Sequence, residues 1–364
     1  MDRNVRLKLV KEGKAKLLVP DVAIPEHGKN VAFYNPAMSL DRDLSVLIVK
    51  AFRELYLKKF KREPRICDAL TASGVRAIRY SLESGVKLVT ACDKNARACE
   101  IARKNSELNQ VEIEVVNLDA NLLLHSRKFD VIDIDPFGSP ARFIDAAAKS
   151  LSHFSLLMLT ATDTATLFGV YPETCKLRYF CRSLRCQFAR ELGTRILLSF
   201  VIRALASHEK AFLPLLSYAH RHYVRVYGLV EKNKSKAKAL LKKFAPIWCD
   251  YYEWHLKEKS DAEFVGELYL GKLHDREFLK VAMKESSEYQ MAISVLSTAI
   301  QEIETPFYFD THALAKLTRK HAPKLEKAID ELRKANIAAS KCVFDSKAFK
   351  AACSLREVLS LVFK

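Results

Sequence analysis

Long apolar runs are missing from this sequence of 364 residues. No stretch approaches the ~18–20 uninterrupted apolar residues that a membrane-spanning helix needs, so we expect no segment embedded in a membrane. The first residues lead into charged positions and not into an apolar run, so we expect no signal peptide. With 49% hydrophobic and 28% charged residues and no internal repeat, the composition excludes disordered, collagen-like and coiled-coil proteins.

Paired cysteines, which hold many structural zinc ions, are missing as well. The nine cysteines include no Cys-x-x-Cys pair, and the spacings within the nearest cluster, Cys175, Cys181 and Cys186, suit no common zinc site. We therefore interpret the cysteines as buried thiols of a protein in the reducing cytoplasm.

Acidic residues are few relative to basic ones. The chain has 60 Lys and Arg against 43 Asp and Glu, a net charge of +17. This excess favours a polyanionic partner, nucleic acid first and an acidic membrane face second. Residues 176–210 hold eight basic and two acidic side chains, and residues 316–350 hold ten basic and four acidic ones. Both segments are candidates for RNA phosphate contacts, and in the second we select Arg319, Lys320, Lys324 and Lys327.

The first part of the chain has the pattern of an α/β sheet. Between residues 65 and 163, short apolar runs alternate with helical stretches, which predicts a parallel, doubly wound sheet. Apolar and polar residues alternate over residues 5–19, which predicts a β-hairpin before the sheet. Residues 213–219 and 223–230 predict an antiparallel strand pair after it, because the break between them is too short for a crossover helix.

The second part of the chain turns mainly helical from about residue 271. Residues 313–320 and 324–335 predict two helices, and the alternating residues 337–349 predict a β-wing. This is the outline of a winged helix. We therefore expect a larger α/β domain over residues 1–270 and a smaller α+β, winged-helix-like domain over residues 271–364.

Four predicted strands of the α/β sheet are followed by an acidic residue: Asp68, Asp93, Asp119 and Asp135. Ligands of open α/β sheets bind where loops leave the carboxyl ends of the strands. Asp93 lies 19 residues beyond Gly74 in the sequence, a spacing at which nucleotide-binding sheets place an acidic residue. Its two carboxylate oxygens can accept hydrogen bonds from the two hydroxyls of a ribose. Asp119 with Ala120 is placed to receive an adenine edge. This layout predicts a cofactor that contains a nucleoside.

The glycine-rich motif of dinucleotide enzymes, Gly-x-Gly-x-x-Gly, is absent. Its glycines allow a helix N-terminus to take a pyrophosphate, whereas the turn Thr71-Ala72-Ser73-Gly74 has one glycine. S-adenosyl-L-methionine carries no pyrophosphate and needs only one close backbone approach. Together with the acidic residues, the turn favours S-adenosyl-L-methionine over NAD.

The segment Asp135-Pro136-Phe137 follows the fourth strand and suits methylation of an exocyclic amine. The lone pair of such an amine is delocalised into the base. The carboxylate of Asp135 and the carbonyl oxygen of Pro136 can both accept from the amine, which localises the pair, and Phe137 offers a stacking face to a flipped-out base. Methylation at a base carbon would use a nucleophilic cysteine, and no cysteine lies near this turn in the sequence. A strand-end turn with a buried phenylalanine is the structural alternative.

Several motifs resemble those of the tRNA guanine-26 N2-dimethyltransferase family. The segment Asp135-Pro136-Phe137-Gly138-Ser139-Pro140 is similar to the family signature. Further similarities, which together cover most of the chain, lie at Glu12–Lys16, Phe33–Pro36, Arg42-Asp43, Asp68–Arg76, Thr160–Asp163, Gly193–Leu197, Leu270–Asp275 and Phe309–His312. The compact length is similar to that of archaeal members.

The resemblance implies a Rossmann-like class I S-adenosylmethionine-dependent methyltransferase sheet and a C-terminal tRNA-binding domain. It implies two transfers of methyl to N2 of guanine 26 in tRNA, through N2-methylguanosine to N2,N2-dimethylguanosine. Phe33 would lie near the methyl group and the target base. An arginine can hold the methionine carboxylate by charge-assisted bonds. By motif matching, the cofactor contacts fall on Arg42, Arg76, Asp93, Asp119 and Ala120.

One departure from the family concerns zinc. Many members carry a zinc-binding cysteine set just before the segment that corresponds to Leu270–Asp275. Here that region offers a single cysteine, Cys249, with His255, which cannot fill a tetrahedral site. We therefore predict no bound metal, with aromatic packing in its place.

Two other functions stay open at this point. The same chemistry would serve another base-amine methyltransferase, acting on guanine N2 of rRNA or adenine N6 of DNA. A non-catalytic RNA-binding protein with a degenerate methyltransferase fold belongs to a different class, and the intact acids at four strand ends argue against it. The expected partner is tRNA, and neither a membrane nor an obligate protein partner is evident.

Overall fold

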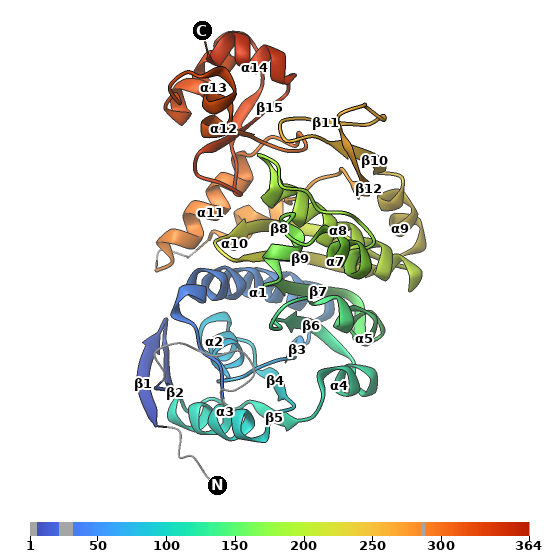
Figure 1. Cartoon of the computed structure of the whole chain (residues 1–364). Coiled ribbons are helices and arrows are strands. Elements are labelled where there is room, and N and C mark those ends of the chain that lie inside the picture. The colour runs from blue at the N-terminus through green and yellow to red at the C-terminus, as the bar shows by residue number, and fades with distance from the viewer. Residues whose placement is uncertain (1–5, 22–31, 285–287, 364) are drawn as a thin grey trace. The chain divides into compact units, whose positions relative to one another are not determined.

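Figure 1 shows the computed structural model of the chain, which describes residues 6–21, 32–284 and 288–363. The chain forms two compact units. Unit 1 comprises residues 1–160, 227–232 and 277–293, and unit 2 comprises residues 161–226, 233–276 and 294–364. This division differs from the boundary expected after residue 270, because compactness follows packing and not order along the chain. The expected boundary separates the parts by function and stays a prediction.

The predicted N-terminal hairpin is confirmed. Strand β1 (Leu7–Glu12) pairs antiparallel with β2 (Ala15–Pro20). The alternation of the sequence places Leu17 and Val19 on the buried side of β2, where they pack with Val75 and Ile78.

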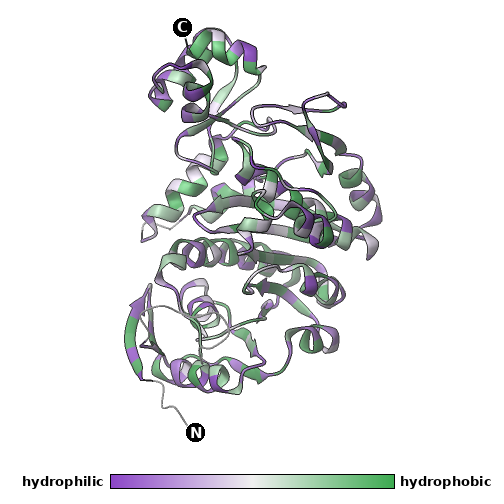
Figure 2. Cartoon of the chain, viewed as in Figure 1, coloured by the Kyte–Doolittle hydropathy of each residue, from purple (hydrophilic) through white to green (hydrophobic). Residues whose placement is uncertain are grey.

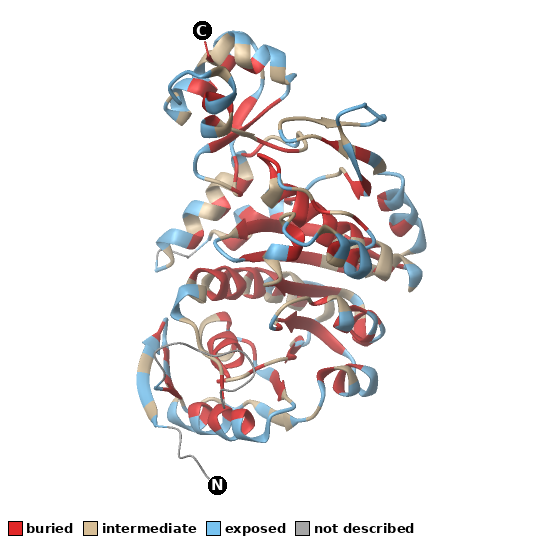
Figure 3. Cartoon of the chain, in the orientation of Figure 1, coloured by how far each residue is buried: buried red, intermediate tan, exposed pale blue. Residues whose placement is uncertain are grey.

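The predicted doubly wound parallel sheet is confirmed too. Its parallel strands are β3 (Arg65–Asp68), β4 (Leu88–Asp93), β5 (Glu114–Asn117), β6 (Phe129–Ile134) and β7 (Leu151–Ala161). In the full sheet the strand order is β5-β4-β3-β6-β7-β9-β8, so the predicted strand pair is found as neighbours, β9 (Tyr223–Lys232) and β8 (Lys210–His220). β6 is buried along its whole length, as expected for an inner strand (Figure 3).

Helices cover both faces of this parallel part. In Figure 1, α1 (Ser39–Phe60), α2 (Val75–Ser84) and α3 (Ala96–Leu108) lie on one side, and α4 (Ala120–Ser126) and α5 (Ile144–Ser150) on the other. Hydrophobic and hydrophilic residues alternate along these helices, so each can bury one face against the sheet (Figure 2). Two short 3-10 turns, Pro36–Met38 and Ala141–Phe143, precede α1 and α5.

The remaining elements up to residue 301 are mainly those of unit 2. They are α6 (Thr164–Leu167), α7 (Pro172–Tyr179), α8 (Ala189–Ser207), α9 (Lys234–Leu241), β10 (Phe244–Cys249), β11 (Trp254–His255), β12 (Glu263–Tyr269), α10 (Arg276–Ala282) and α11 (Gln290–Gln301). Strands β11, β10 and β12 form a separate antiparallel sheet in that order. Among the described residues, no helix is long and apolar enough to span a membrane.

The C-terminal segment has the two helices and the wing expected of a winged-helix-like fold. It comprises β13 (Phe309–Asp310), α12 (Thr311–Thr318), α13 (Leu325–Lys334), β14 (Ala339–Lys341), β15 (Ala348–Ala351) and α14 (Leu355–Val362). The strands form a sheet in the order β13-β15-β14. Leu314, Ile329, Leu332, Phe349 and Val358 form its core.

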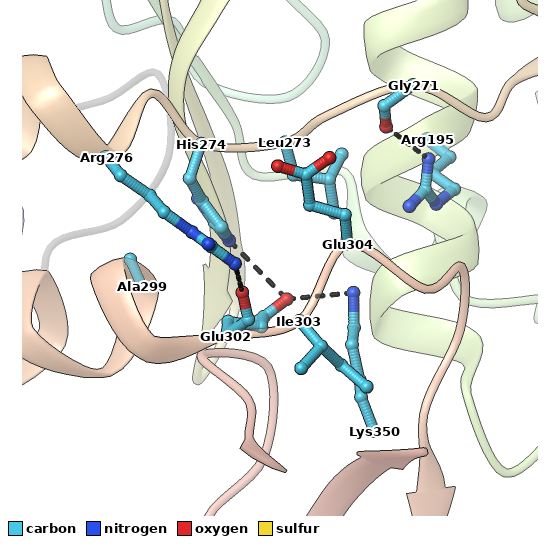
Figure 4. Close-up of a pocket in the computed structure, with 10 residues that line it drawn as sticks. All are labelled: Arg195, Gly271, Leu273, His274, Arg276, Ala299, Glu302, Ile303, Glu304 and Lys350. Atoms are coloured by element: carbon cyan, nitrogen blue, oxygen red, sulfur yellow. Dashed lines mark hydrogen bonds and ion pairs between the residues drawn. The ribbon is translucent and has the colours of Figure 1, made fainter. Parts of the chain in front are cut away.

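A buried ionic cluster ties this C-terminal segment to the rest of unit 2 (Figure 4). Lys350 Nζ lies 2.8 Å from Glu302 Oε1 and 3.1 Å from Glu191 Oε1, and His274 Nε2 lies 3.5 Å from the same oxygen of Glu302. Burial alone would raise the pKa of Glu302, but the charges of Lys350 and His274 lower it to about 2. Buried charges persist only when they are paired, so Glu302 and Lys350 depend on each other.

Candidate functional site

The acidic strand ends meet where the strand order reverses. From β3 the chain continues outward to β4 and β5, whereas β6 and β7 lie on the other side of β3. A crevice for ligands forms outside the carboxyl ends of the strands at such a point. Asp68 ends β3, Asp133 lies beside it on β6, and Asp135 follows β6 directly. The structure therefore brings the predicted acids Asp68 and Asp135 together at the edge of the sheet where this crevice is expected.

Asp135 is held in place by Arg76, which lies in the first turn of α2. Nε of Arg76 donates to Oδ2 of Asp135 at 2.9 Å, and Nη2 donates to the same oxygen at 2.6 Å. The guanidinium also donates to Asp41 and, from Nη1 at 3.4 Å, to Asp133. Burial alone would lower the pKa of Arg76, but these three carboxylates raise it well above its usual value. Arg76 is thus a fixed cation at the centre of the crevice.

One carboxylate oxygen of Asp135 is left for a ligand. All contacts of Arg76 with Asp135 go to Oδ2, and no hydrogen bond from the described part of the chain reaches Oδ1. The side chain of Asp135 is 23% exposed, whereas that of Arg76 is 5% exposed. Asp135 can therefore accept a hydrogen bond from a molecule in the crevice while its plane stays fixed.

Two phenylalanines that were predicted from different motifs meet beside Asp135. The rings of Phe33 and Phe137 lie edge to face, with centroids 4.7 Å apart. Phe137 is 50% exposed and Pro136 is buried, so the structural alternative of a buried phenylalanine does not apply. A half-exposed aromatic ring next to a carboxylate can stack on a planar ligand.

The turn between β3 and α2 brings the backbone close to the crevice. Ala72 and Gly74 both have positive φ, +47° and +80°. A Cβ at Gly74 would lie 3.1 Å from Cβ of Ala102 on α3, which explains why glycine is needed there. Thr71 Oγ1 donates to Oδ2 of Asp68 at 2.7 Å, which locks the start of the turn.

Two buried polar atoms of this region have no partner among the described residues. They are Oδ1 of Asp68 and Oγ of Ser73, and both side chains are completely buried. Burial, together with the nearby charge of Asp133, raises the pKa of Asp68 to about 7. Unpaired buried polar atoms are costly, so these two indicate that a polar ligand completes the site.

The predicted nucleoside contacts lie along the same edge of the sheet. Asp93 is partly exposed at the end of β4, and its two oxygens accept from the backbone N–H groups of Ala72 and Asn95 at 3.0 and 2.9 Å. Asp119 is exposed and caps α4, accepting from Asn121 N at 2.8 Å, and Ala120 is buried behind it. Each carboxylate is oriented by the backbone and keeps lone pairs for a ligand.

Arg42 lies apart from the Arg76 network. Its Nε donates to Oε1 of Glu12 at 2.6 Å, and its Nη2 donates to the carbonyl oxygen of Asn35 at 2.9 Å. The guanidinium also lies over the ring of Tyr34, 5.3 Å from its centroid. Both predicted arginines are therefore already paired with protein carboxylates. Contact of Arg42 with a cofactor stays a prediction, and for Arg76 the structure offers the positioning of Asp135 as an alternative to the predicted cofactor contact.

Sequence reasoning missed the acidic partners of these arginines. Asp41 and Asp133 hold Arg76, the hydroxyl of Tyr80 donates to Asp133, and Glu12 is shared by Arg42 and Arg79. One signal was available for Asp133. It lies on β6 two residues before Asp135, and residues i and i+2 of an extended chain share a face.

The predicted RNA-binding residues are exposed in the C-terminal segment. Arg319 ends α12, Lys320 follows it and donates to the carbonyl oxygen of Phe363 at 2.7 Å, and Lys324 and Lys327 lie at the start of α13. They form a basic surface at the junction of the two helices, and its contact with RNA stays a prediction.

The region where zinc was considered contains an internal cation. Ligand atoms of Asp250, Glu253 and His255 lie within 4.8 Å of one another. Nζ of Lys259 lies 3.6 Å from Asp250, 3.7 Å from Glu253 and 3.2 Å from Nε2 of His255, so an ammonium group already balances the two carboxylates. The expected aromatic packing is present, with Trp248 4.7 Å from Phe264 between ring centroids. The absence of zinc stays a prediction.

Comparisons with known proteins find similar chains over almost the whole length. A family model described as N2,N2-dimethylguanosine tRNA methyltransferase matches residues 13–362. A tRNA (guanine(26)-N(2))-dimethyltransferase from Pyrobaculum islandicum is 35% identical over 98% of this chain and 99% of the relative. A tRNA (guanine(26)-N(2)/guanine(27)-N(2))-dimethyltransferase from Aquifex aeolicus is 35% identical over 86% of this chain and 85% of the relative.

A solved structure is similar as well. Trm1 from Pyrococcus horikoshii, in complex with S-adenosyl-L-methionine, matches 98% of this chain and 99% of its own with a TM-score of 0.86 and 29% identity. This similarity confirms the predicted fold class.

Proposed function

The chain belongs to the N2,N2-dimethylguanosine tRNA methyltransferase family, and we propose that it methylates the N2 amine of guanine 26 in tRNA with S-adenosyl-L-methionine as methyl donor. Two successive transfers convert the amine to its dimethyl form. The protein acts on tRNA in the cytoplasm and needs no obligate protein partner. The net charge of +17 and the exposed basic surface of the C-terminal segment support a tRNA substrate.

The residues of the crevice fit S-adenosyl-L-methionine. The unpaired oxygens of Asp68 and Ser73 require a polar ligand, and the turn at Gly74 lets one approach the backbone. Asp93 would bind the ribose hydroxyls, and Asp119 with Ala120 would bind the adenine edge. Bound there, the cofactor supplies an electrophilic methyl group.

The acceptor of the amine protons is Asp135. Its Oδ1 and the carbonyl oxygen of Pro136 accept hydrogen bonds from the N2 amine, which localises the lone pair on nitrogen. Arg76 holds Oδ2, so the carboxylate cannot turn away from the base. When the new N–C bond forms, the nitrogen carries one proton too many, and Asp135 takes it up. The rings of Phe33 and Phe137 hold the flipped-out base in place.

A single observation carries this proposal. At the switch point of the sheet, the carboxylate of Asp135 is fixed through one oxygen and offers the other beside a half-exposed aromatic ring. A degenerate fold would have no reason to keep a buried cation that orients this one carboxylate. The geometry therefore supports an enzyme over an inert RNA-binding scaffold.

The test is methyl transfer from radiolabelled S-adenosyl-L-methionine to unmodified tRNA transcripts, with digestion and mass spectrometry of the product. We expect label on N2 of guanine 26, first as the monomethyl and then as the dimethyl nucleoside. A transcript with adenine at 26 is the matched control, and label on its guanine 27 would extend the specificity to the neighbour. Methylation of rRNA or of DNA adenine, with tRNA left unlabelled, would overturn the proposal.

A further inference from the structure

A second cavity lies wholly within unit 2 and contains none of the residues of the methyl-transfer site. Its volume is about 240 Å³. Three segments and one further residue line it: residues 252–254 at the start of β11, residues 305–309 that lead into β13, residues 351–355 at the end of β15, and Phe188 just before α8. β11 and β15 can be followed in Figure 1.

The lining of this cavity is unusually aromatic. Six aromatic side chains contribute to it: Phe188, Tyr252, Trp254, Phe307, Tyr308 and Phe309. Three of them are in contact, because the ring of Phe307 lies 5.4 Å from that of Trp254 and 4.8 Å from that of Phe188. Tyr252, Trp254 and Phe309 are only half-buried, so their faces are within reach of a ligand.

The size and the polar groups of the cavity limit which ligands can bind in it. At about 240 Å³ it is smaller than the roughly 300–1,000 Å³ of pockets for drug-sized molecules, and it suits one planar ring system. Glu253 and Thr305 also line it. A carboxylate accepts hydrogen bonds, so a flat ring with N–H donors on its edge matches both the walls and the polar group.

The surroundings supply positive charge for a phosphate backbone. Arg356, exposed on α14, directly follows the lining residue Leu355. Ala351, which lines the cavity, directly follows the segment 316–350 in the sequence, with its ten basic and four acidic residues. Aromatic faces inside a basic rim are the usual combination for unstacked bases of RNA.

We propose that this cavity binds one unstacked nucleobase of the tRNA substrate, distinct from the guanine that is methylated. Trp254 and Tyr252 provide the stacking faces, Glu253 reads the N–H edge of the base, and Arg356 beside the cavity binds a flanking phosphate. The inference rests on the proposed tRNA substrate and adds a second anchoring point for it. Such a site would grip tRNA through a base in unit 2 while the target base is in the crevice of unit 1.

A matched pair of tryptophan variants tests this assignment. The chain has two tryptophans, both half-buried in the same three-stranded sheet, and only Trp254 lines the cavity. Trp254→Leu should weaken the binding of unmodified tRNA transcripts about 5-fold to 150-fold, the range for loss of one base–aromatic stack. Trp248→Leu should leave tRNA affinity near wild type. Both variants should bind S-adenosyl-L-methionine normally.

Cys353 provides a readout that needs no disruptive substitution. It lines the cavity and is the one cysteine of the nine that is not buried. Burial raises the pKa of its thiol to about 11, so alkylation requires mildly alkaline pH and excess maleimide. Unmodified tRNA should protect Cys353 from the reagent, whereas S-adenosyl-L-methionine and an RNA duplex of matched length should not. Cys353→Ser is the control for labelling elsewhere.

The outcomes separate this inference from the proposed function. Methyl transfer to guanine 26, together with normal tRNA affinity of Trp254→Leu and unprotected Cys353, would overturn the base site alone. Equal protection by the duplex would also overturn it, because the contact would then be to phosphates only. Absence of methyl transfer and of tRNA binding by the wild type would overturn both.

Should Trp254→Leu fail to fold, Trp248→Phe leaves Trp254 as the single tryptophan, whose emission can be excited selectively over that of tyrosine. Stacking of a base on Trp254 should then quench its emission in proportion to bound tRNA. Unchanged emission at saturating tRNA would refute the assignment.

Discussion

Replacing Arg76 with lysine should slow methyl transfer without weakening the binding of S-adenosyl-L-methionine. In the structure the guanidinium donates twice to Asp135, at 2.9 and 2.6 Å, and also to Asp41 and Asp133. A lysine keeps the charge, but its single nitrogen cannot span three carboxylates as the planar guanidinium does. Asp135 would therefore lose the contact that fixes its plane.

The expected size of the effect follows from these contacts. A displacement of about 1 Å in a catalytic group can cost roughly 10²-fold in rate, so we expect kcat to fall about 10-fold to 100-fold. The Kd for the cofactor should stay near wild type, since Arg76 acts on Asp135. If Arg76 instead holds the methionine carboxylate, that Kd should rise about 10-fold to 100-fold, because a charge-assisted bond of about 1.5–3 kcal/mol is lost.

The assay pairs single-turnover methyl transfer at saturating cofactor with calorimetric titration of S-adenosyl-L-methionine. Arg79→Lys is the matched control, since Arg79 is buried on the same helix and pairs with Glu12, Asp43 and Glu83 but not with Asp135. It should lower Tm and leave kcat near wild type. A raised Kd for the cofactor in Arg76→Lys, with kcat unchanged, would refute our account of this arginine.

Four further predictions concern other parts of the molecule. Asp135→Asn should lower turnover by about 10²-fold or more while calorimetry shows unchanged cofactor affinity, because a proton acceptor is lost. Asp93→Ala should weaken cofactor binding about 10-fold to 100-fold in the same titration, and NAD should not bind. Lys350 and His274 hold the pKa of folded Glu302 at about 2, below its ordinary 4.5. Urea unfolding should therefore show its full contribution to stability above pH 4.5 and a growing loss of that contribution as the pH falls towards 2. Arg319→Glu with Lys327→Glu should lower the affinity for all substrate tRNAs by a similar factor in filter binding, and this loss of affinity should shrink as the salt concentration rises.

Each of these predictions has an outcome that would contradict it. Near wild-type turnover of Asp135→Asn would show that Asp135 is not the proton acceptor. Tight NAD binding would overturn the cofactor assignment. Glu302→Gln should reduce the acid-dependent loss of stability between pH 4.5 and 2, and an unchanged pH profile would count against the buried pair. For the charge reversal, Lys87→Glu with Lys104→Glu changes the net charge equally at exposed sites of unit 1. Equal losses in both double variants would mean that net charge, and not the C-terminal surface, sets tRNA affinity.

Much of the site could be predicted because its residues lie next to recognisable strand ends. The apolar run before Asp135 and the turn before Gly74 are local features, and both were predicted at the correct strand. The pairing of Phe33 with Phe137 was not predicted, because the two residues come from separate motifs more than one hundred positions apart. The motifs indicated that Arg76 contacts a cofactor, but nothing in the sequence indicated its contact with Asp135.

The sequence by itself determined the elements, the acids at the strand ends, the single-glycine turn and the positive charge. These features depend on hydrophobic periodicity and on the conformational preferences of neighbouring residues, which are local properties. The tertiary structure alone decided which charges meet. Arg76 contacts Asp41 and Asp135, 35 and 59 residues away in the chain, because α1, α2 and β6 converge on the point where the strand order reverses. Ion pairs and aromatic cavities of this kind depend on long-range packing, and no local pattern of residues encodes that packing.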